Sequence, residues 1–213
     1  TAWTPIEVRA TPVEVPPDRL APGIELRNAW SLAALDPRFG GLSGMVIEGD
    51  RLIAVSDRGA LFAARLTGSS GHPLAGVAGR QLRDASGEPL TGWAGDAEAL
   101  AREGGGLAVA FERDHRILSG GWPEPGPLDA PRRLPGVEAL APNDGIEALA
   151  TLPDGRLVAL AEGRSRGLIM VWVSDGQGGW TRADMPARGP HLVTGADAAP
   201  DGTLLVVKRH YTR

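Results

Sequence analysis

One strand–turn–strand pattern recurs along the chain and constrains its fold more than any other feature. The clearest copy runs from Gly145 to Gly163, where two apolar stretches flank the dipeptide Asp154-Gly155. Asp-Gly is typical of two-residue hairpin turns, because both central positions of such a turn need a positive φ. Three further copies have their turns at Gly49-Asp50, Gly104 to Gly106 and Asp201-Gly202. The sequence therefore predicts four similar β-hairpins.

The spacing of these copies indicates a β-propeller. The leucines that follow the four turns are separated by 55, 50 and 47 residues; they are Leu52, Leu107, Leu157 and Leu204. Repeats of about 40–50 residues built from strands are typical of propeller blades, which are four-stranded antiparallel sheets. A β-sandwich with coincidental spacing is the alternative. A Rossmann-type fold is disfavoured, because no amphipathic helices separate the strands.

Small apolar residues place the repeated hairpin at the inner edge of each blade. In the clearest copy they are Ala148, Ala150, Ala159 and Ala161. We predict one propeller domain over residues 1–213, with repeats near 42–66, 96–118, 145–173 and 195–211. Strands within 6–33 are expected to complete a blade, and a Gly- and Ser-rich loop is expected after Leu66.

Composition excludes several functions. A formal net charge of -4 without a basic stripe argues against nucleic acid as a partner. No apolar run approaches the roughly 20 residues of a membrane span. The chain has no cysteine, and its four histidines lack zinc-ligand spacing. It begins at Thr1 rather than Met, as an exported protein does after signal cleavage and as an excised domain also does. We expect a periplasmic or secreted protein.

Five short motifs occur in a fixed order: Phe39-Gly-Gly-Leu-Ser-Gly44, Val55-Ser-Asp-Arg-Gly59, Asp96-Ala-Glu-Ala-Leu100, Phe111-Glu-Arg113 and Gly145-Ile-Glu-Ala-Leu149. Together they resemble the bacterial "esterase-like activity of phytase" family, the phytase-like β-propeller proteins, from about Ile6 onward. The resemblance implies a ring of about six blades, so that missing blades or a partner chain would close it. One departure is Lys208, which stands where we expect an acidic residue of the family.

Carboxylates recur at both ends of the predicted hairpins. One set opens them and comprises Asp96, Glu98, Glu147 and Asp197, with Ser43 at the matching place in the first hairpin. Another set closes them, five residues after each aligned leucine, and comprises Asp57, Glu112 and Glu162. Because the inner strands of a propeller all run in the same direction, both sets should face one rim of the central channel.

These carboxylates predict a calcium site. Carboxylates held close together raise one another's pKa unless a cation neutralises them. Ligation by oxygen alone is typical of Ca²⁺. The predicted metal ligands are Asp57, Asp96, Glu98, Glu112, Glu147 and Glu162.

Two arginines beside these carboxylates suggest a substrate. Arg58 and Arg113 are predicted to bind phosphate oxygens, while the metal lowers the pKa of an attacking water. This predicts Ca²⁺-assisted hydrolysis of a phosphate ester. Two alternatives remain open: inter-blade salt bridges made by the same residues, and a non-catalytic propeller that binds a small ligand or a protein at this rim. Serine catalysis at Ser43 is disfavoured, because Met45 replaces the second glycine of G-x-S-x-G.

Overall fold

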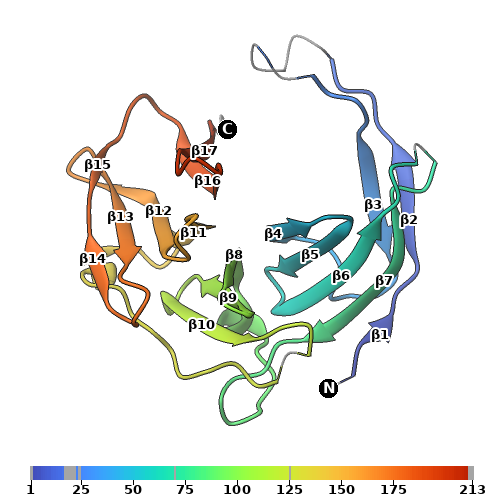
Figure 1. The fold of residues 1–213 in the computed structure, drawn as a ribbon, viewed down its shortest axis with the longest axis horizontal. Helices are drawn as coiled ribbons and strands as arrows, with labels where there is room; N and C mark the ends of the chain where they lie inside the picture. The colour runs from blue at the N-terminus through green and yellow to red at the C-terminus, as the bar shows by residue number, and fades with distance from the viewer. Residues whose placement is uncertain (1, 17–22, 24, 70, 125, 211–213) are drawn as a thin grey trace.

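The computed structural model describes residues 2–16, 23, 25–69, 71–124 and 126–210. Within these residues the chain is all-β, with antiparallel sheets arranged around a common centre (Figure 1). The 3₁₀ turns η2 (Gly92–Gly95) and η3 (Val137–Ala139) interrupt the strands in this described part of the chain. No helix of the described residues is long and apolar enough to cross a bilayer. Ile24 and Tyr211, which bound two predicted elements, lie outside the described residues.

The first predicted repeat forms a five-stranded sheet in the order β1-β7-β6-β5-β4. Its strands are β1 (Thr4–Pro5), β4 (Leu42–Glu48), β5 (Arg51–Ser56), β6 (Ala60–Leu66) and β7 (Leu74–Gln81). The Gly- and Ser-rich loop expected after Leu66 connects β6 to β7, but the sequence did not indicate β7 itself, whose glycines hide the strand signal. A Cβ at Gly79 would lie 2.8 Å from the Phe62 ring, so glycine allows the two strands to pack closely.

The later repeats form three further sheets, of three, five and two strands. The second contains β8 (Ala97–Glu103), β9 (Gly106–Phe111) and β10 (Arg116–Gly121). The third contains β11 (Ile146–Thr151), β12 (Leu157–Ser165), β13 (Leu168–Ser174), β14 (Trp180–Arg182) and β15 (Met185–Pro186). The fourth contains β16 (Leu192–Ala198) and β17 (Leu204–Arg209).

The N-terminal region contributes a separate hairpin of β2 (Val8–Pro12) and β3 (Trp30–Ala34). Val8 and Leu32 of this hairpin pack with Phe62 and Val77 of the five-stranded sheet. The sequence indicates strands at Ile6 to Val15 and at Ile24 to Ala33, and the observed β2 and β3 are shorter than these stretches.

The turn of the third hairpin differs from the two-residue turn that the sequence indicated. Leu152 and Arg156 pair, and the Gly155 N–H donates to the Leu152 carbonyl at 2.8 Å, which leaves three residues in the loop. Only Gly155 has a positive φ, at 85°. Pro153 explains the difference, because proline favours the first central position of a type I turn, which a left-handed glycine then follows.

The first strand of each hairpin lies nearest the centre in Figure 1. β4 contacts β8, β8 contacts β11, and β11 contacts β16. The predicted small residues pack between these sheets, since Ala148, Ala150, Ala159 and Ala161 are all buried. The larger side chains fill the space farther out, where Trp172 is fully buried and donates from Nε1 to the Pro135 carbonyl at 2.8 Å.

Apolar side chains are exposed at both ends of this arc of sheets. Met45 and Ile47 on β4 are each more than half exposed, and so are Leu205 and Val207 on β17. The two strands do not pair in the described residues, and Figure 1 shows them on opposite sides of the opening in the arc.

Candidate functional site

Each of the four hairpins carries a β-bulge at the same place in its first strand. The residues skipped by the pairing are Ser43, Glu98, Glu147 and Thr194. Bulges beside functional sites commonly redirect a side chain. Since β4, β8, β11 and β16 are neighbours around the centre, the bulges of adjacent strands lie near one another.

The fourth hairpin does not follow the predicted acidic pattern. Asp197 was grouped with Glu98 and Glu147, but it pairs with Leu205, and Thr194 occupies the bulge. Glu98 and Glu147 lie nine and ten residues before their aligned leucines, as Thr194 does, but Asp197 lies only seven residues before its own. The grouping of Asp197 with the opening carboxylates is therefore wrong.

The residues that close the hairpins also hold equivalent positions. The backbone N–H groups of Asp57, Glu112 and Glu162 donate to the carbonyls of Gly41, Asp96 and Gly145, at 2.9, 2.8 and 3.0 Å. In the fourth hairpin the residue at this place is Arg209, which pairs with Leu192, while Lys208 lies one position earlier. Arg209, and not Lys208 as the sequence suggested, takes the place of the closing acid.

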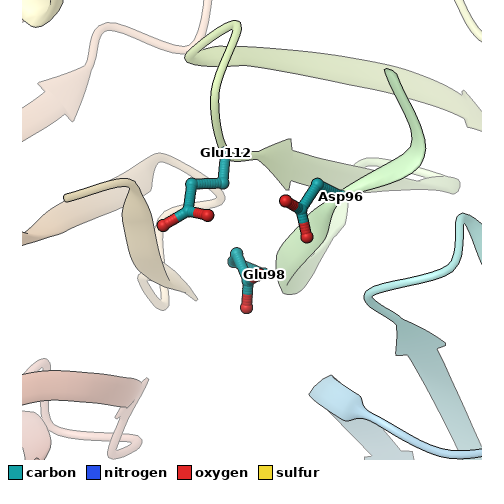
Figure 2. Close-up of side chains that lie close together, drawn as sticks. All are labelled: Asp96, Glu98 and Glu112. Atoms are coloured by element: carbon teal, nitrogen blue, oxygen red, sulfur yellow. The ribbon is translucent and has the colours of Figure 1, made fainter. Parts of the chain in front are cut away.

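Three of the predicted metal ligands form a compact cluster. Asp96 precedes β8, Glu98 lies in its bulge, and Glu112 follows β9. One carboxylate oxygen of each lies within 4.8 Å of the other two. Figure 2 shows the three side chains converging on one small space. A single cation could contact all three carboxylates.

Burial and mutual repulsion hold protons on this cluster. Burial, followed by the charges of Glu147, Glu112 and Asp96, raises the pKa of Glu98 to about 8. Burial, followed by the charges of Glu162 and Glu112, raises the pKa of Glu147 to about 7. Burial and the charge of Asp96 also raise the pKa of Glu112. The carboxylates of the second and third hairpins therefore form one electrostatic unit.

Asp57 lies at the margin of this unit. Burial raises the pKa of its carboxyl, the charge of Arg58 lowers it, and the charge of Asp96 raises it. Arg58 Nε lies 3.8 Å from Asp57 Oδ1, and its Nη1 donates to the Pro37 carbonyl. Both side chains are about half exposed. The carboxylate also packs against Gly41, where a Cβ would lie only 2.2 Å from it.

Arg113 partly neutralises the cluster. Its Nε donates to Asp96 Oδ2 at 2.7 Å, and its Nη1 donates to Asn143 Oδ1 at 2.6 Å. Its guanidinium carbon lies 5.4 Å from the centroid of the Trp93 ring. The ion pair with Asp96 raises the pKa of Arg113. The sequence analysis does not single out Asn143, although it lies two residues before the motif that begins at Gly145.

Some of the expected salt bridges between sheets are present. Arg209 Nη2 lies 3.5 Å from Glu162 Oε1 and joins the fourth sheet to the third. Arg102 Nε lies 2.6 Å from Glu48 Oε1 and joins the second sheet to the first. Within the part of the chain that the structure describes, neither Glu98 nor Glu147 has a cationic group within 4.0 Å. Salt bridges thus account for Glu162 and Asp96, and leave the two bulge glutamates unpaired with a cation.

Solved structures show only distant likenesses. The computationally designed Ika4 protein is 18% identical with a TM-score of 0.40, covering 78% of this chain and 90% of that one. The designed Ika8 protein is 16% identical, also with a TM-score of 0.40, over 78% of this chain and 45% of that one. Human WBSCR16 is 18% identical with a TM-score of 0.35, and the match covers 85% of this chain and 48% of that one.

Comparison with protein families is more informative. No curated protein matches the sequence. The family model described as "Phytase-like: Esterase-like activity of phytase" matches residues 37–213, a stretch that contains all four hairpins and every predicted ligand. The chain therefore belongs to the phytase-like family, described as having the esterase-like activity of phytase.

Proposed function

We propose that this chain binds Ca²⁺ at its central carboxylates and uses it to hydrolyse phosphate esters. The observation that carries the proposal is the cluster of Asp96, Glu98 and Glu112, whose oxygens lie within 4.8 Å of one another. The donor set fits a hard cation, because it consists of carboxylate oxygens that Ca²⁺ collects in sets of 6–8. The charge of Glu162 helps to raise the pKa values of Glu147 and Glu112, and the charge of Glu147 helps to raise that of Glu98. Both residues therefore lie near the cluster and would supply further oxygens.

The remaining residues would bind and orient the ester. Arg58, with its half-exposed side chain, and Arg113, which Asp96 and Asn143 hold in place, would contact phosphate oxygens. When bound, the cation would polarise the phosphoryl oxygens and lower the pKa of a coordinated water. In the overall reaction, the water oxygen bonds to phosphorus, the phosphorus–oxygen bond to the alcohol breaks, and a water proton ends on the released alcohol.

We further propose that the fold is a single β-propeller over residues 1–213. The contacts of β4 with β8, β8 with β11 and β11 with β16 support this, because inner strands of successive blades are neighbours. In this interpretation, further strands or a partner chain cover the exposed side chains at the two ends of the arc, Met45 and Ile47 at one and Leu205 and Val207 at the other. Light scattering at several concentrations measures whether copies of the chain associate.

Thermal unfolding tests the metal site directly. Ca²⁺ at about 100 times its Kd should stabilise the wild type by roughly 2.7 kcal/mol relative to EDTA. Glu98→Gln should lose this shift, whereas Glu25→Gln, at an exposed carboxylate outside the sheets, should keep it. An identical unfolding midpoint with Ca²⁺ and with EDTA would sink the proposed site.

Turnover then separates an enzyme from a binding protein. We expect Ca²⁺-dependent hydrolysis of p-nitrophenyl phosphate by the wild type and by Glu25→Gln, and its loss in Glu98→Gln. Calcium binding without turnover would favour the alternative, a non-catalytic protein that binds a ligand at the same rim.

A further inference from the structure

A second concave site lies directly beside the carboxylate cluster. It is a pocket of about 770 Å³, within the range of roughly 300–1,000 Å³ that is typical of small-molecule sites. Its walls come from the segment between β7 and β8, the turn between β9 and β10, and the segments on either side of η3. Apolar side chains provide much of the lining, including Leu90, Trp93, Leu118, Pro131 and Pro142.

Trp93 gives this pocket an aromatic surface. Its side chain is 78% exposed, in contrast to Trp172, which is fully buried in the core. The Arg113 guanidinium lies over the Trp93 ring, and the indole lines the pocket. An exposed indole offers a stacking surface to a planar ring.

The charges of the pocket disfavour an anion inside it. Three aspartates and two arginines contribute to the lining, a formal excess of one negative charge. Arg116 is buried, and its guanidinium already donates to the carbonyls of Asp114 and Ala94, at 3.1 and 2.6 Å. Asp114 pairs with Arg133 at 2.5 Å. The pocket is therefore suited to an uncharged group.

Arg113 forms the wall between this pocket and the carboxylate cluster. The same guanidinium lines the pocket and donates from Nε to Asp96 Oδ2. A ligand that places a phosphate at the cluster and extends past Arg113 would therefore enter the pocket with its other end.

We propose that the pocket binds the aromatic alcohol portion of the phosphate ester, so that the chain prefers aryl phosphate monoesters to polyphosphorylated polyols. The inference rests on the proposed function for the position of the phosphate. The nature of the group that enters the pocket is argued separately from that function. It follows from the exposed Trp93 ring, the apolar lining and the excess of negative charge.

Binding of an uncharged probe tests the pocket without the metal. In EDTA, titration calorimetry should detect 2-naphthol binding to the wild type and to Glu98→Gln with equal affinity. Trp93→Ala should weaken this binding by roughly 2- to 10-fold, the effect of one aromatic contact. Trp93→Phe should retain most of it. Because Trp93 is exposed, circular dichroism should show that both variants are folded.

Hydrolysis tests the same site through specificity. With Ca²⁺, the wild type should have a higher kcat/KM for 1-naphthyl phosphate than for inositol hexakisphosphate, and Trp93→Ala should reduce this ratio. Calcium-dependent turnover without 2-naphthol binding, or with equal binding by wild type and Trp93→Ala, would overturn the pocket assignment and leave the proposed function standing. Tryptophan-dependent binding of 2-naphthol without turnover would support the aromatic site and contradict the hydrolase.

Discussion

Glu98 and Glu147 occupy the same bulge position in two neighbouring hairpins, and burial together with the charge of Glu147 raises the pKa of Glu98 to about 8. Burial and the charge of Glu162 raise the pKa of Glu147 to about 7. Among the residues that the structure describes, neither glutamate has a cationic group within 4.0 Å, and the metal ion proposed above would displace their protons on binding.

The first prediction concerns the pH dependence of the metal-free protein. Unfolded glutamates titrate near pH 4.3, so between about pH 5 and 8 the folded chain holds protons that the unfolded chain has lost. Its free energy of unfolding should therefore fall as the pH rises through this window. Thermal unfolding in EDTA at pH 5, 6, 7 and 8 measures this, and a midpoint that rises with pH would contradict the raised pKa values.

Replacing one of the repelling carboxylates should stabilise the metal-free protein. Glu98→Gln removes a buried negative charge, and we expect a gain of about 1 kcal/mol at pH 8, or roughly 2–4 °C in Tm. The gain should shrink at pH 5, where Glu98 is already protonated. Glu25→Gln provides the exposed control and should have little effect at either pH. Equal effects of the two substitutions at pH 8 would argue against charge repulsion.

Arg113 should stabilise the fold because its planar guanidinium hydrogen-bonds two acceptors at once, Asp96 and Asn143. Arg113→Ala removes the hydrogen bonds to Asp96 and Asn143, and should lower the free energy of unfolding. Arg113→Lys retains the charge but cannot reach both acceptors, so it should recover only part of the loss. Arg133→Ala, which breaks an exposed pair with Asp114, should cost less than about 1 kcal/mol. Urea unfolding compares the three variants, and full recovery by lysine would show that charge alone matters.

Gly41 should be needed to position Asp57. Its φ is 55°, and a Cβ there would lie 2.2 Å from the Asp57 carboxylate. Gly49→Ala is a matched control, because Gly49 has a φ of 61° and open space around it. The control should cost about 1–2 kcal/mol for its backbone conformation alone. Gly41→Ala should cost more, as measured by urea unfolding, and equal losses would mean that the carboxylate moves aside without cost.

Local sequence features predicted the hairpins well. The turns at Gly49-Asp50 and Gly104-Gly105 lie between paired strands, whereas Gly106, expected in the second turn, already pairs with Glu103. The positions of the closing acids follow from counting five residues along one strand from the leucine after each turn. Turn chemistry is a property of a few adjacent residues, which is why the sequence alone contains it.

Errors arose where pairing between strands decides the outcome. The sequence indicates no strand at β7, because its glycines carry no strand signal until Phe62 packs against Gly79. Asp197 and Lys208 do not hold the predicted positions, because the pairing of β16 with β17 gives the bulge to Thr194 and the closing position to Arg209.

The sequence by itself determined the all-β class, the four hairpins and the recurrence of carboxylates at their ends, because each depends on neighbouring residues. Only the tertiary structure decided which carboxylates lie within reach of one cation, that Arg113 neutralises Asp96, and that Trp93 borders a pocket beside them. These features depend on how separate sheets pack around a shared centre, and the distances between sheets are fixed by side-chain packing rather than by any local pattern.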